Sequence, residues 1–420
     1  MFVEPIEAVV SKIMNTTPFV RRVVIQNYKS IASTDVAMRQ LTFLVGPNGA
    51  GKSNFIDALR FVADALRTSL DNALRERGGI NEVRRRSSGH PTHFGMRLEF
   101  TLPSGTAGHY SFLIGALAKG GYEVQKEECL VQEPDGQRHY FTARKGKIES
   151  NFDSPPAGFP DRLYLVNVSG LRYFRSVYDA FSNMGFYNLN PQVVRELQAP
   201  ESGDLLLRDG SNLTSVIARM TKSAVDRKNL IEEYLSKVAR DIRGVEATAV
   251  GPKETLEFRQ DVAGAKSPWR FFASNMSDGT LRALGVLVAL FQSDHDSTTV
   301  PLVGIEEPEA ALHPAAAGVL LDALREASGL RQVIVTSHSP DLLDNDEIQA
   351  EEIYSVTSTG GVTHIAPIDD AGRDMLRGHL YTAGELLRMN QLTAQAELFD
   401  EPSKATQYEL FDIASEKSER

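Results

Sequence analysis

The sequence contains very little cysteine and no long apolar run. Cys129 is the single cysteine among 420 residues, so the chain cannot form an internal disulfide, which fits a reducing compartment. We interpret Cys129 as a small, buried hydrophobic residue rather than a reactive thiol. No stretch approaches ~18 uninterrupted apolar residues, and the first residues lack the basic segment and apolar run of a signal peptide. These features predict a cytoplasmic protein with no membrane partner.

Positive charge is also scarce. The chain has 45 Lys and Arg against 55 Asp and Glu, a formal net charge of -10. This balance argues against a protein that coats nucleic acid over its whole surface. Net charge does not describe distribution, so a local basic surface and contact with DNA stay open. The candidate for such a basic surface is a set of arginines. A solvated loop without a nucleic-acid contact is an equally good interpretation of this set. The set comprises Arg75, Arg77, Arg84, Arg85 and Arg86.

Hydrophobic periodicity indicates an α/β protein. Two strand-like runs precede a glycine-rich turn, after which residues 55–70 carry apolar residues at helical spacing. Residues 94–168 contain short runs separated by Gly, Pro and Asp, which is typical of antiparallel hairpins. Residues 173–239 are mostly helical in pattern. Two strand–helix units then begin near residues 301 and 332, and they indicate a mainly parallel sheet with functional loops at the carboxyl ends of its strands.

The most specific motif is a phosphate-binding loop. Residues 46–53 follow the pattern G-x-x-x-x-G-K-S between a predicted strand and a predicted helix, which counts against a chance glycine-rich turn. Glycines let backbone N–H groups face the phosphates, Lys52 can reach the β- and γ-phosphates, and Ser53 can ligate Mg²⁺. The helix N-terminus also favours an anion. The expected contacts to ATP are Gly46, Asn48, Gly49, Ala50, Gly51, Lys52, Ser53 and Asn54.

Three later segments narrow the chemistry. One strand-like run ends in Glu306, which we assign to the Mg²⁺ side, and Glu307, which we expect to polarise the attacking water; two ordinary solvated acids are the alternative. Ser277 and Gly279 open an apolar helix and can present a hydroxyl and N–H groups to an anion. A plain N-cap would use the same residues. His338 follows another strand-like run, where it could contact the γ-phosphate and the water.

The order of these motifs resembles the ABC-type ATPases of the RecF/SMC group. The resemblance extends to stand-alone heads related to the overcoming-lysogeny-defect nucleases and to bacterial anti-phage ATPases. Further matching segments lie at 25–31, 207–213 and 383–387, so the resemblance covers about residues 20–388. It implies an α/β fold: a P-loop ABC-type ATPase head with a mixed sheet, a β-rich lobe and a helical insert. No sustained heptad tract is present, so we expect no long coiled coil.

The resemblance also implies an assembly. In that family two heads enclose two ATP molecules, so Ser277 and Gly279 of one subunit would complete the site around Lys52 of the other. Residues 311–314 fall where the family has its D-loop, and His338 matches the switch histidine. The chain departs from the family in having Glu306 where many relatives have Asp. Gln192 is the candidate for the Q-loop glutamine, and it matches weakly.

We divide the chain into six segments on these patterns. They are an N-terminal extension (1–17), a P-loop lobe (18–93), a β-rich lobe (94–168), a helical insert (169–270), a lobe with the signature, Walker B and switch segments (271–388) and a disordered tail (389–420).

Three functions agree with a Mg²⁺-dependent ATP hydrolase of this type. The chain could be the sensor or scaffold of a bacterial anti-phage system that works with a separate, nuclease-like effector. We favour this function because too few residues follow His338 for a Toprim nuclease domain. A RecF-like ATPase of DNA repair or chromosome maintenance is the alternative. The motif at residues 27–31 and the Glu-Glu-Pro-Glu sequence disfavour a transporter subunit.

The tail contains a short repeat. The pattern Q-x-E-L-F-D occurs at residues 395–400 and again at 407–412. It resembles the Q-x-x-L-F peptides that bind the bacterial sliding clamp, so Gln395–Phe399 and Gln407–Phe411 are candidate clamp ligands. Docking of these segments onto the protein's own head is the other possibility.

Overall fold

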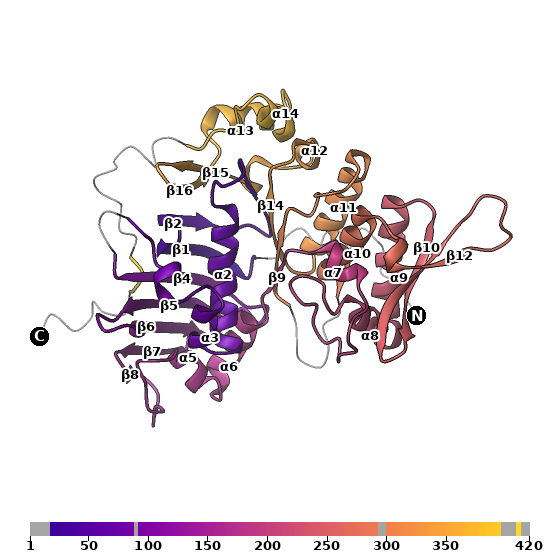
Figure 1. Cartoon of the computed structure of the whole chain (residues 1–420). Helices are drawn as coiled ribbons and strands as arrows, with labels where there is room; N and C mark the ends of the chain where they lie inside the picture. Colours follow the sequence, from indigo (N-terminus) through magenta and orange to yellow (C-terminus); the bar gives the residue numbers. More distant parts are fainter. Residues whose placement is uncertain (1–16, 88–90, 293–299, 396–408, 413–420) are drawn as a thin grey trace, which may run out of the picture. The chain divides into compact units, whose positions relative to one another are not determined.

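The computed structural model describes residues 17–87, 91–292, 300–395 and 409–412 (Figure 1). The chain forms two compact units. The first unit comprises residues 1–184, 350–374 and 392–420, and the second comprises residues 185–349 and 375–391. Apart from the helical insert and the tail, the finer lobes expected from the sequence stay predictions.

A mixed sheet forms the first unit. Its strands, in order across the sheet, are β8 (Lys147–Ser150), β7 (Arg138–Arg144), β6 (Tyr122–Gln132), β5 (Ala107–Ala116), β4 (His93–Thr101), β1 (Val20–Tyr28), β2 (Ile31–Ala37), β16 (Val362–Pro367), β15 (Ile353–Thr359) and β3 (Leu41–Val45). Neighbours from β8 to β2 are antiparallel, which confirms the hairpins expected over 94–168. The β16–β2 and β15–β3 pairs are parallel.

Helices cover one face of this sheet. They are α2 (Lys52–Arg67), α3 (Leu70–Arg75), α4 (Ile80–Val83), α5 (Tyr164–Val168) and α6 (Arg172–Ser182). Figure 1 shows α2 lying across the strands. Phe61 of α2 meets Phe94 of β4 with ring centroids 5.4 Å apart, and Phe181 of α6 meets Phe100 at 5.5 Å. Because side chains alternate along a strand, every second residue of β4 enters this aromatic core.

The second unit combines a parallel sheet with helices and a separate antiparallel sheet. The parallel strands are β14 (Gln332–Ser337), β13 (Leu302–Glu306) and β9 (Gly185–Tyr187), and the antiparallel strands are β10 (Ile242–Val250), β11 (Lys253–Gln260) and β12 (Trp269–Phe272). The helices are α7 (Pro191–Arg195), α8 (Leu213–Ser223), α9 (Val225–Val238), α10 (Asp278–Phe291), α11 (Ala317–Ser328), α12 (Pro340–Leu343) and α14 (Ala383–Arg388). Helix α13 (Asp370–Arg377) contains the boundary between the units.

Two structural expectations need correction. The segment expected as a helical insert, 169–270, contains α8 and α9, but it also contains the β10–β11 hairpin. The tail was expected to be without structure from residue 389. Instead Leu410 is buried against the first unit, only 6 % exposed. The first tail repeat beyond Gln395, together with Gln407 and Tyr408, lies outside the described residues.

Helix length is modest in the described parts of the chain. The longest helix there is α2, with 16 residues, so those parts hold no extended coiled-coil arm. No helix within the same residue ranges has both the length and the apolar character to span a bilayer.

Candidate active site

The predicted phosphate-binding loop connects β3 to α2 in the first unit. Asn48 and Gly49 lie exposed at its tip, and Ala50 is buried. Gly51 has φ of 105°, a left-handed conformation in which side chains are strained, and a Cβ there would lie 2.0 Å from Oγ1 of Thr363. The same Thr363 hydroxyl donates to the Ala50 carbonyl at 2.8 Å. The β15–β16 hairpin therefore supports the loop through a residue that the motif does not contain.

The start of α2 is suited to hold an anion. Its N-cap, Gly51, has no side chain to bind the first N–H groups, and the first turn contains no acidic residue. Lys52 is buried, and its ammonium donates to the carbonyls of Gly46 at 2.7 Å and Pro47 at 3.1 Å. A cation beside an uncapped helix N-terminus fits the phosphates of a nucleotide.

Ser53 and Asn54 occupy the first turn of α2. Ser53 is exposed, whereas the Asn54 amide donates to the Ser30 hydroxyl at 2.6 Å. In the described residues, no three His, Cys, Asp or Glu side chains gather as a metal site. Magnesium bound with a nucleotide commonly takes only one or two protein ligands besides phosphates and water. The Ser53 hydroxyl and a carboxylate such as Glu306 are ligands of that kind.

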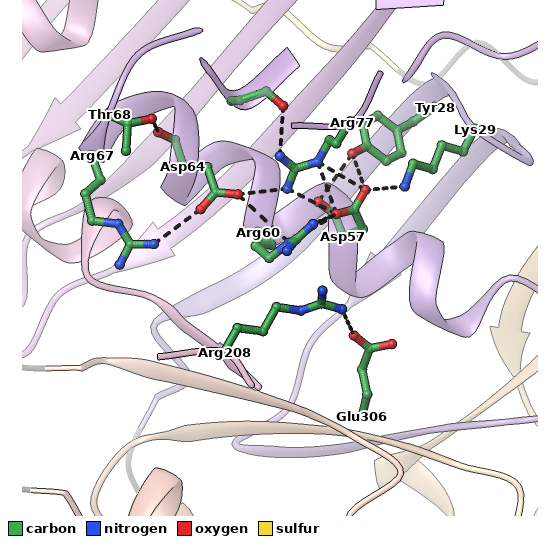
Figure 2. A network of polar contacts seen from close by, with 11 residues as sticks. Tyr28, Lys29, Asp57, Arg60, Asp64, Arg67, Thr68, Arg77, Arg208 and Glu306 are labelled. Atoms are coloured by element: carbon green, nitrogen blue, oxygen red, sulfur yellow. Dashed lines mark hydrogen bonds and ion pairs between the residues drawn. The ribbon is translucent and has the colours of Figure 1, made fainter. Parts of the chain in front are cut away.

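A buried charge network anchors α2 (Figure 2). Asp57 accepts hydrogen bonds from the Tyr28 hydroxyl at 2.8 Å, Arg60 at 2.6 Å and Arg77 at 3.1 Å, and it pairs with Lys29 at 2.5 Å. Burial acts to raise the pKa of Asp57, but Arg77, Lys29 and Arg60 outweigh it and hold that pKa well below its usual range. The network joins the turn after β1 to the helix that follows the phosphate-binding loop.

Both interpretations of the arginine set place its members at the protein surface, and this is wrong for Arg77. The Arg77 side chain is only 2 % exposed, and it binds Asp64 at 2.9 Å as well as Asp57. Arg77 therefore belongs to the interior. Arg75 and Arg86 are exposed. Arg75 pairs with Asp71 on its own helix, α3, and Arg86, which follows α4, pairs with Glu82 of that helix.

In the second unit the two predicted acids stand at the end of β13. Oε1 of Glu306 accepts a hydrogen bond from Arg208 at 2.7 Å (Figure 2). Glu307 has φ of 46°, and its N–H donates to the carbonyl of Thr336 at 3.0 Å. Oε1 of Glu307 lies 3.2 Å from Nδ1 of His338, and both side chains are more than a third exposed. The structure thus brings an accessible carboxylate and imidazole together at adjacent strand ends.

Arg282 connects α10 to these strand ends. Its guanidinium donates to the carbonyls of Glu306 at 3.1 Å, Glu307 at 2.9 Å and Leu189 at 2.7 Å. Burial lowers the pKa of Arg282 despite the neighbouring glutamates. Motif reading missed Arg282, and its place in an apolar helix is the one sequence signal that marks it, because a cation there needs a partner.

Glu309 contacts β14, the strand that precedes His338. It accepts a hydrogen bond from the Ser337 hydroxyl at 2.6 Å. Burial raises its pKa, although Ser337 and His338 act in the opposite direction. The third glutamate of the Glu-Glu-Pro-Glu sequence, Glu309, therefore faces the protein interior.

Ser277 and Gly279 begin α10. The Ser277 hydroxyl accepts from the Thr280 N–H at 3.1 Å, so the N-cap alternative is present. A Cβ on Gly279 would lie 2.5 Å from the Ala311 carbonyl oxygen, so only glycine permits this approach of residues 311–314. Gln192 accepts a hydrogen bond from Arg195 in α7, and its assignment to a Q-loop stays a prediction.

Comparison with known proteins places these features in a family. Residues 41–344 match AAA_21, described as "AAA domain, putative AbiEii toxin, Type IV TA system". Among curated proteins, a 176-residue segment is 26% identical to structural maintenance of chromosomes protein 1 of Schizosaccharomyces pombe. The match covers 38% of this chain and only 14% of that relative.

Solved structures show the same fold. One is an Smc head bound to the C-winged helix domain of ScpA, with a TM-score of 0.50, 16% identity and coverage of 83% of this chain and 97% of that one. Another is an Smc head with an extended coiled coil from Pyrococcus furiosus, bound to the C-terminal domain of ScpA. Its TM-score is 0.51 at 12% identity, with 87% and 100% coverage. The chain belongs to the AAA_21 family of AAA-domain proteins, and it has the α/β fold of an SMC head.

Proposed function

We propose that the chain hydrolyses Mg-ATP with Glu307 as the residue that activates water, within a dimer of heads. The pairing of Glu307 with His338 is the observation that carries this proposal. A carboxylate that is accessible to water, next to an imidazole, can take up the proton of an attacking water. Family membership supplies the reaction class.

The first unit supplies phosphate binding in this proposal. The backbone of residues 46–51 and the Lys52 ammonium hold the phosphates at the N-terminus of α2. Bound Mg²⁺ would neutralise phosphate charge, with Ser53 and Glu306 as its protein ligands. Arg208, which pairs with Glu306, orients that carboxylate.

In the second unit, His338 and Glu307 share the proton chemistry. With Nδ1–H donated to Glu307, the imidazole keeps Nε2 as an acceptor or donor for the γ-phosphate side. Arg282 fixes the backbone of both acids through their carbonyls, so it positions Glu307 without itself touching substrate.

Substitution of Glu307 tests the assignment. Glu307→Gln keeps the shape and the neighbour of the side chain but removes its basicity, so ATP turnover should fall at least about a hundredfold. ATP binding, measured by equilibrium dialysis with labelled nucleotide, should stay within a few-fold of wild type because the phosphate contacts are intact.

Glu347→Gln is the matched control. This side chain is 67% exposed, and it forms a long ion pair, of 3.8 Å, to Arg325, so turnover should not change. Wild-type turnover by Glu307→Gln would remove Glu307 from the mechanism.

The cellular role that we infer is that of an ATP-dependent sensor or scaffold in bacterial anti-phage defence, with a separate effector. The family description, which refers to a toxin of a toxin–antitoxin system, supports a defence setting. The relative named for structural maintenance of chromosomes supports the second candidate, a RecF-like ATPase of DNA repair or chromosome maintenance. Affinity purification of Glu307→Gln with ATP from the native host separates the two. Recovery of a nuclease-like partner supports defence, and recovery of repair proteins alone supports the second candidate.

A further inference from the structure

The face of the first unit opposite α2 is charged rather than apolar. On β4, Gly95, Arg97 and Glu99 alternate with the aromatic core residues and so point to this face. By register, Ser111 of β5 lies beside Arg97, and Glu128 of β6 lies beside Ser111. Arg97, Ser111 and Glu128 are all buried even though they lie on the face without helices.

The second tail repeat covers these residues. Leu410 is buried, and its Cδ1 lies 2.5 Å from where a Cβ on Gly95 would be. Leu113 of β5 lies 3.1 Å from the same point. The hollow over Gly95 therefore exists because residue 95 has no side chain, and Leu410 fills it together with Leu113.

Polar contacts fix the rest of the repeat. Arg97 donates to the Asp412 carboxylate at 2.5 Å and to the Leu410 carbonyl at 3.4 Å. The Asp412 N–H donates to Glu128 at 3.0 Å, and the Lys126 ammonium lies 3.9 Å from the centre of the Phe411 ring. Burial acts to raise the pKa of Glu128, but hydrogen bonds from His109 and the Asp412 N–H lower it. We call Gly95, Arg97, Leu113, Lys126 and Glu128 the tail cradle.

The tail cradle contacts the Leu, Phe and Asp residues that both tail repeats share. Leu fills the hollow, Phe lies over an ammonium, and Asp meets a guanidinium. Residues 397–400 have the same sequence, Glu-Leu-Phe-Asp, as residues 409–412. The first copy can therefore make each of these contacts in any tail cradle that it reaches.

The first copy is badly placed for the tail cradle of its own chain. The Gln395 N–H donates to the Pro367 carbonyl of β16 at 3.1 Å. Leu398 follows three residues later, which is ~10 Å at full extension. In the sheet order β4-β1-β2-β16, β4 is three strand spacings from β16, about 14 Å. The second copy follows a longer connection, residues 396–408.

We propose that the tail cradle is a binding site for Glu-Leu-Phe-Asp segments, and that residues 397–400 dock into the cradle of a second copy of the chain. The occupant in cis, residues 409–412, competes with this exchange because its tether gives it a high effective concentration. Removal of the cis occupant therefore opens the cradle, and the exchange links two chains without any nucleotide.

Disulfide trapping tests the exchange. An acceptor chain carries Leu113→Cys together with Leu410→Ala, Phe411→Ala and Asp412→Ala, which remove the side-chain contacts of the cis occupant. A donor chain with a larger tag carries Leu398→Cys. Cys129 is fully buried, and burial raises the pKa of its thiol, so it stays unreactive. Mixed without nucleotide and oxidised, the two chains should give a cross-linked product of their combined size on a non-reducing gel. Leu113→Cys with Leu410→Cys in one otherwise unchanged chain should instead close within the monomer.

A donor with Ala405→Cys is the matched control, since it lies in the same connection but outside both repeats. Equal cross-linking by the Ala405→Cys donor would overturn the proposal. So would a monomeric disulfide between positions 113 and 398 within one chain that also carries Leu410→Ala, Phe411→Ala and Asp412→Ala.

Peptide binding provides a second readout. A labelled peptide of residues 394–402 should bind the full chain carrying Leu410→Ala, Phe411→Ala and Asp412→Ala, and Asp400→Ala in the peptide should weaken it at least about tenfold, because Arg97 loses its carboxylate. A peptide that binds a purified bacterial sliding clamp but not this opened chain would overturn the assignment. Neither measurement needs ATP, so the result is independent of the catalytic proposal.

Discussion

At the scale of single residues, Glu307 has a left-handed backbone conformation that non-glycine residues rarely adopt. A non-glycine residue at φ of 46° costs on the order of 1–3 kcal/mol unless its surroundings hold it. Here the Glu307 N–H binds the Thr336 carbonyl and the Glu307 carbonyl accepts from Arg282. The strain is thereby offset by contacts that also aim the carboxylate at His338.

Glu127 is a second residue whose environment has a measurable consequence. It is fully buried on β6, and it accepts hydrogen bonds from the Tyr164 and Leu165 N–H groups and from the Tyr110 hydroxyl. Burial raises the pKa of Glu127 to about 7, although these hydrogen bonds act to lower it. The folded chain therefore holds a proton that the unfolded chain releases at lower pH.

This shift predicts a loss of stability as pH rises. Between pH 4.5, the ordinary value, and about 7 the unfolded state ionises first. The free energy of unfolding should then fall by about 3 kcal/mol across that window. Glu127→Gln cannot ionise, so its melting temperature, followed by circular dichroism from pH 4.5 to 7.5, should fall less than that of wild type.

Glu149→Gln is the control, because Glu149 is an exposed residue of the same sheet. Its pH profile should run parallel to that of wild type. Parallel profiles for Glu127→Gln and wild type would mean that Glu127 is ionised in the folded state throughout this range.

At the scale of elements, the Asp57 network decides how firmly α2 is held. Asp57→Asn leaves the Arg77 guanidinium, 2 % exposed, with half of its charge partners. Breaking a buried pair on one side should lower the free energy of unfolding of the first unit by about 3 kcal/mol in urea.

The comparison is Asp71→Asn, which removes an ion pair between exposed side chains on α3. An exposed pair contributes at most about 1 kcal/mol, so this variant should unfold close to wild type. Equal losses in the two variants would show that the buried network does not stabilise α2.

The elements that the sequence predicted well are those specified locally. The phosphate-binding loop, its flanking strand and helix, and the hairpins of 94–168 follow from short patterns of glycine and alternating apolar residues. The prediction for Arg77 was wrong because its partner Asp57 lies 20 residues earlier in the sequence, on α2. Thr363 and Arg282 could not be found from motifs for the same reason. Thr363 supports a loop that lies more than 300 residues earlier in the sequence, and the acceptors of Arg282 are backbone carbonyls, which a sequence motif does not specify.

The contacts of the tail, too, are made with residues that are distant in the sequence and could not be predicted from a local pattern. Four residues at 409–412 have no helical or strand-like period, and their neighbours are polar. Their binding position depends on Gly95, which has no side chain, and on Arg97. Both residues lie about 315 residues earlier in the sequence. Composition therefore predicted a disordered tail, and only the repeat itself indicated docking onto the protein's own head as one possibility.

At the scale of the whole molecule, the proposed dimer makes Ser277 act on the nucleotide of its partner. Lys52→Ala removes phosphate binding, and Ser277→Arg places a bulky cation on the N-cap, so each variant alone should be inactive. Mixing them should restore turnover, since one composite site of each heterodimer keeps both wild-type residues. Steady-state ATPase rates at several mixing ratios check this, with heterodimer formation followed by two different tags.

The mixing experiment needs a reference rate and a check that heterodimers form. Each variant mixed with wild type gives the reference rate for a dimer with one damaged chain. Heterodimers that form and stay inactive would remove the trans role of Ser277 and leave it as the N-cap of α10.

Helix α10 has a thermodynamic consequence. Its N-cap is Ser277, and it is buried from Ala283 to Phe291. Arg282 lies about 8 Å along the helix from Ser277, and its guanidinium donates to the carbonyl of Glu307. A ligand that binds at Ser277 and shifts this helix changes the free energy of the arrangement around Glu307. Such coupling is reciprocal, so the arrangement around Glu307 must change affinity at Ser277 by the same factor. Loss of the γ-phosphate would then lower the affinity at Ser277, and hydrolysis itself would set the lifetime of the contact between heads.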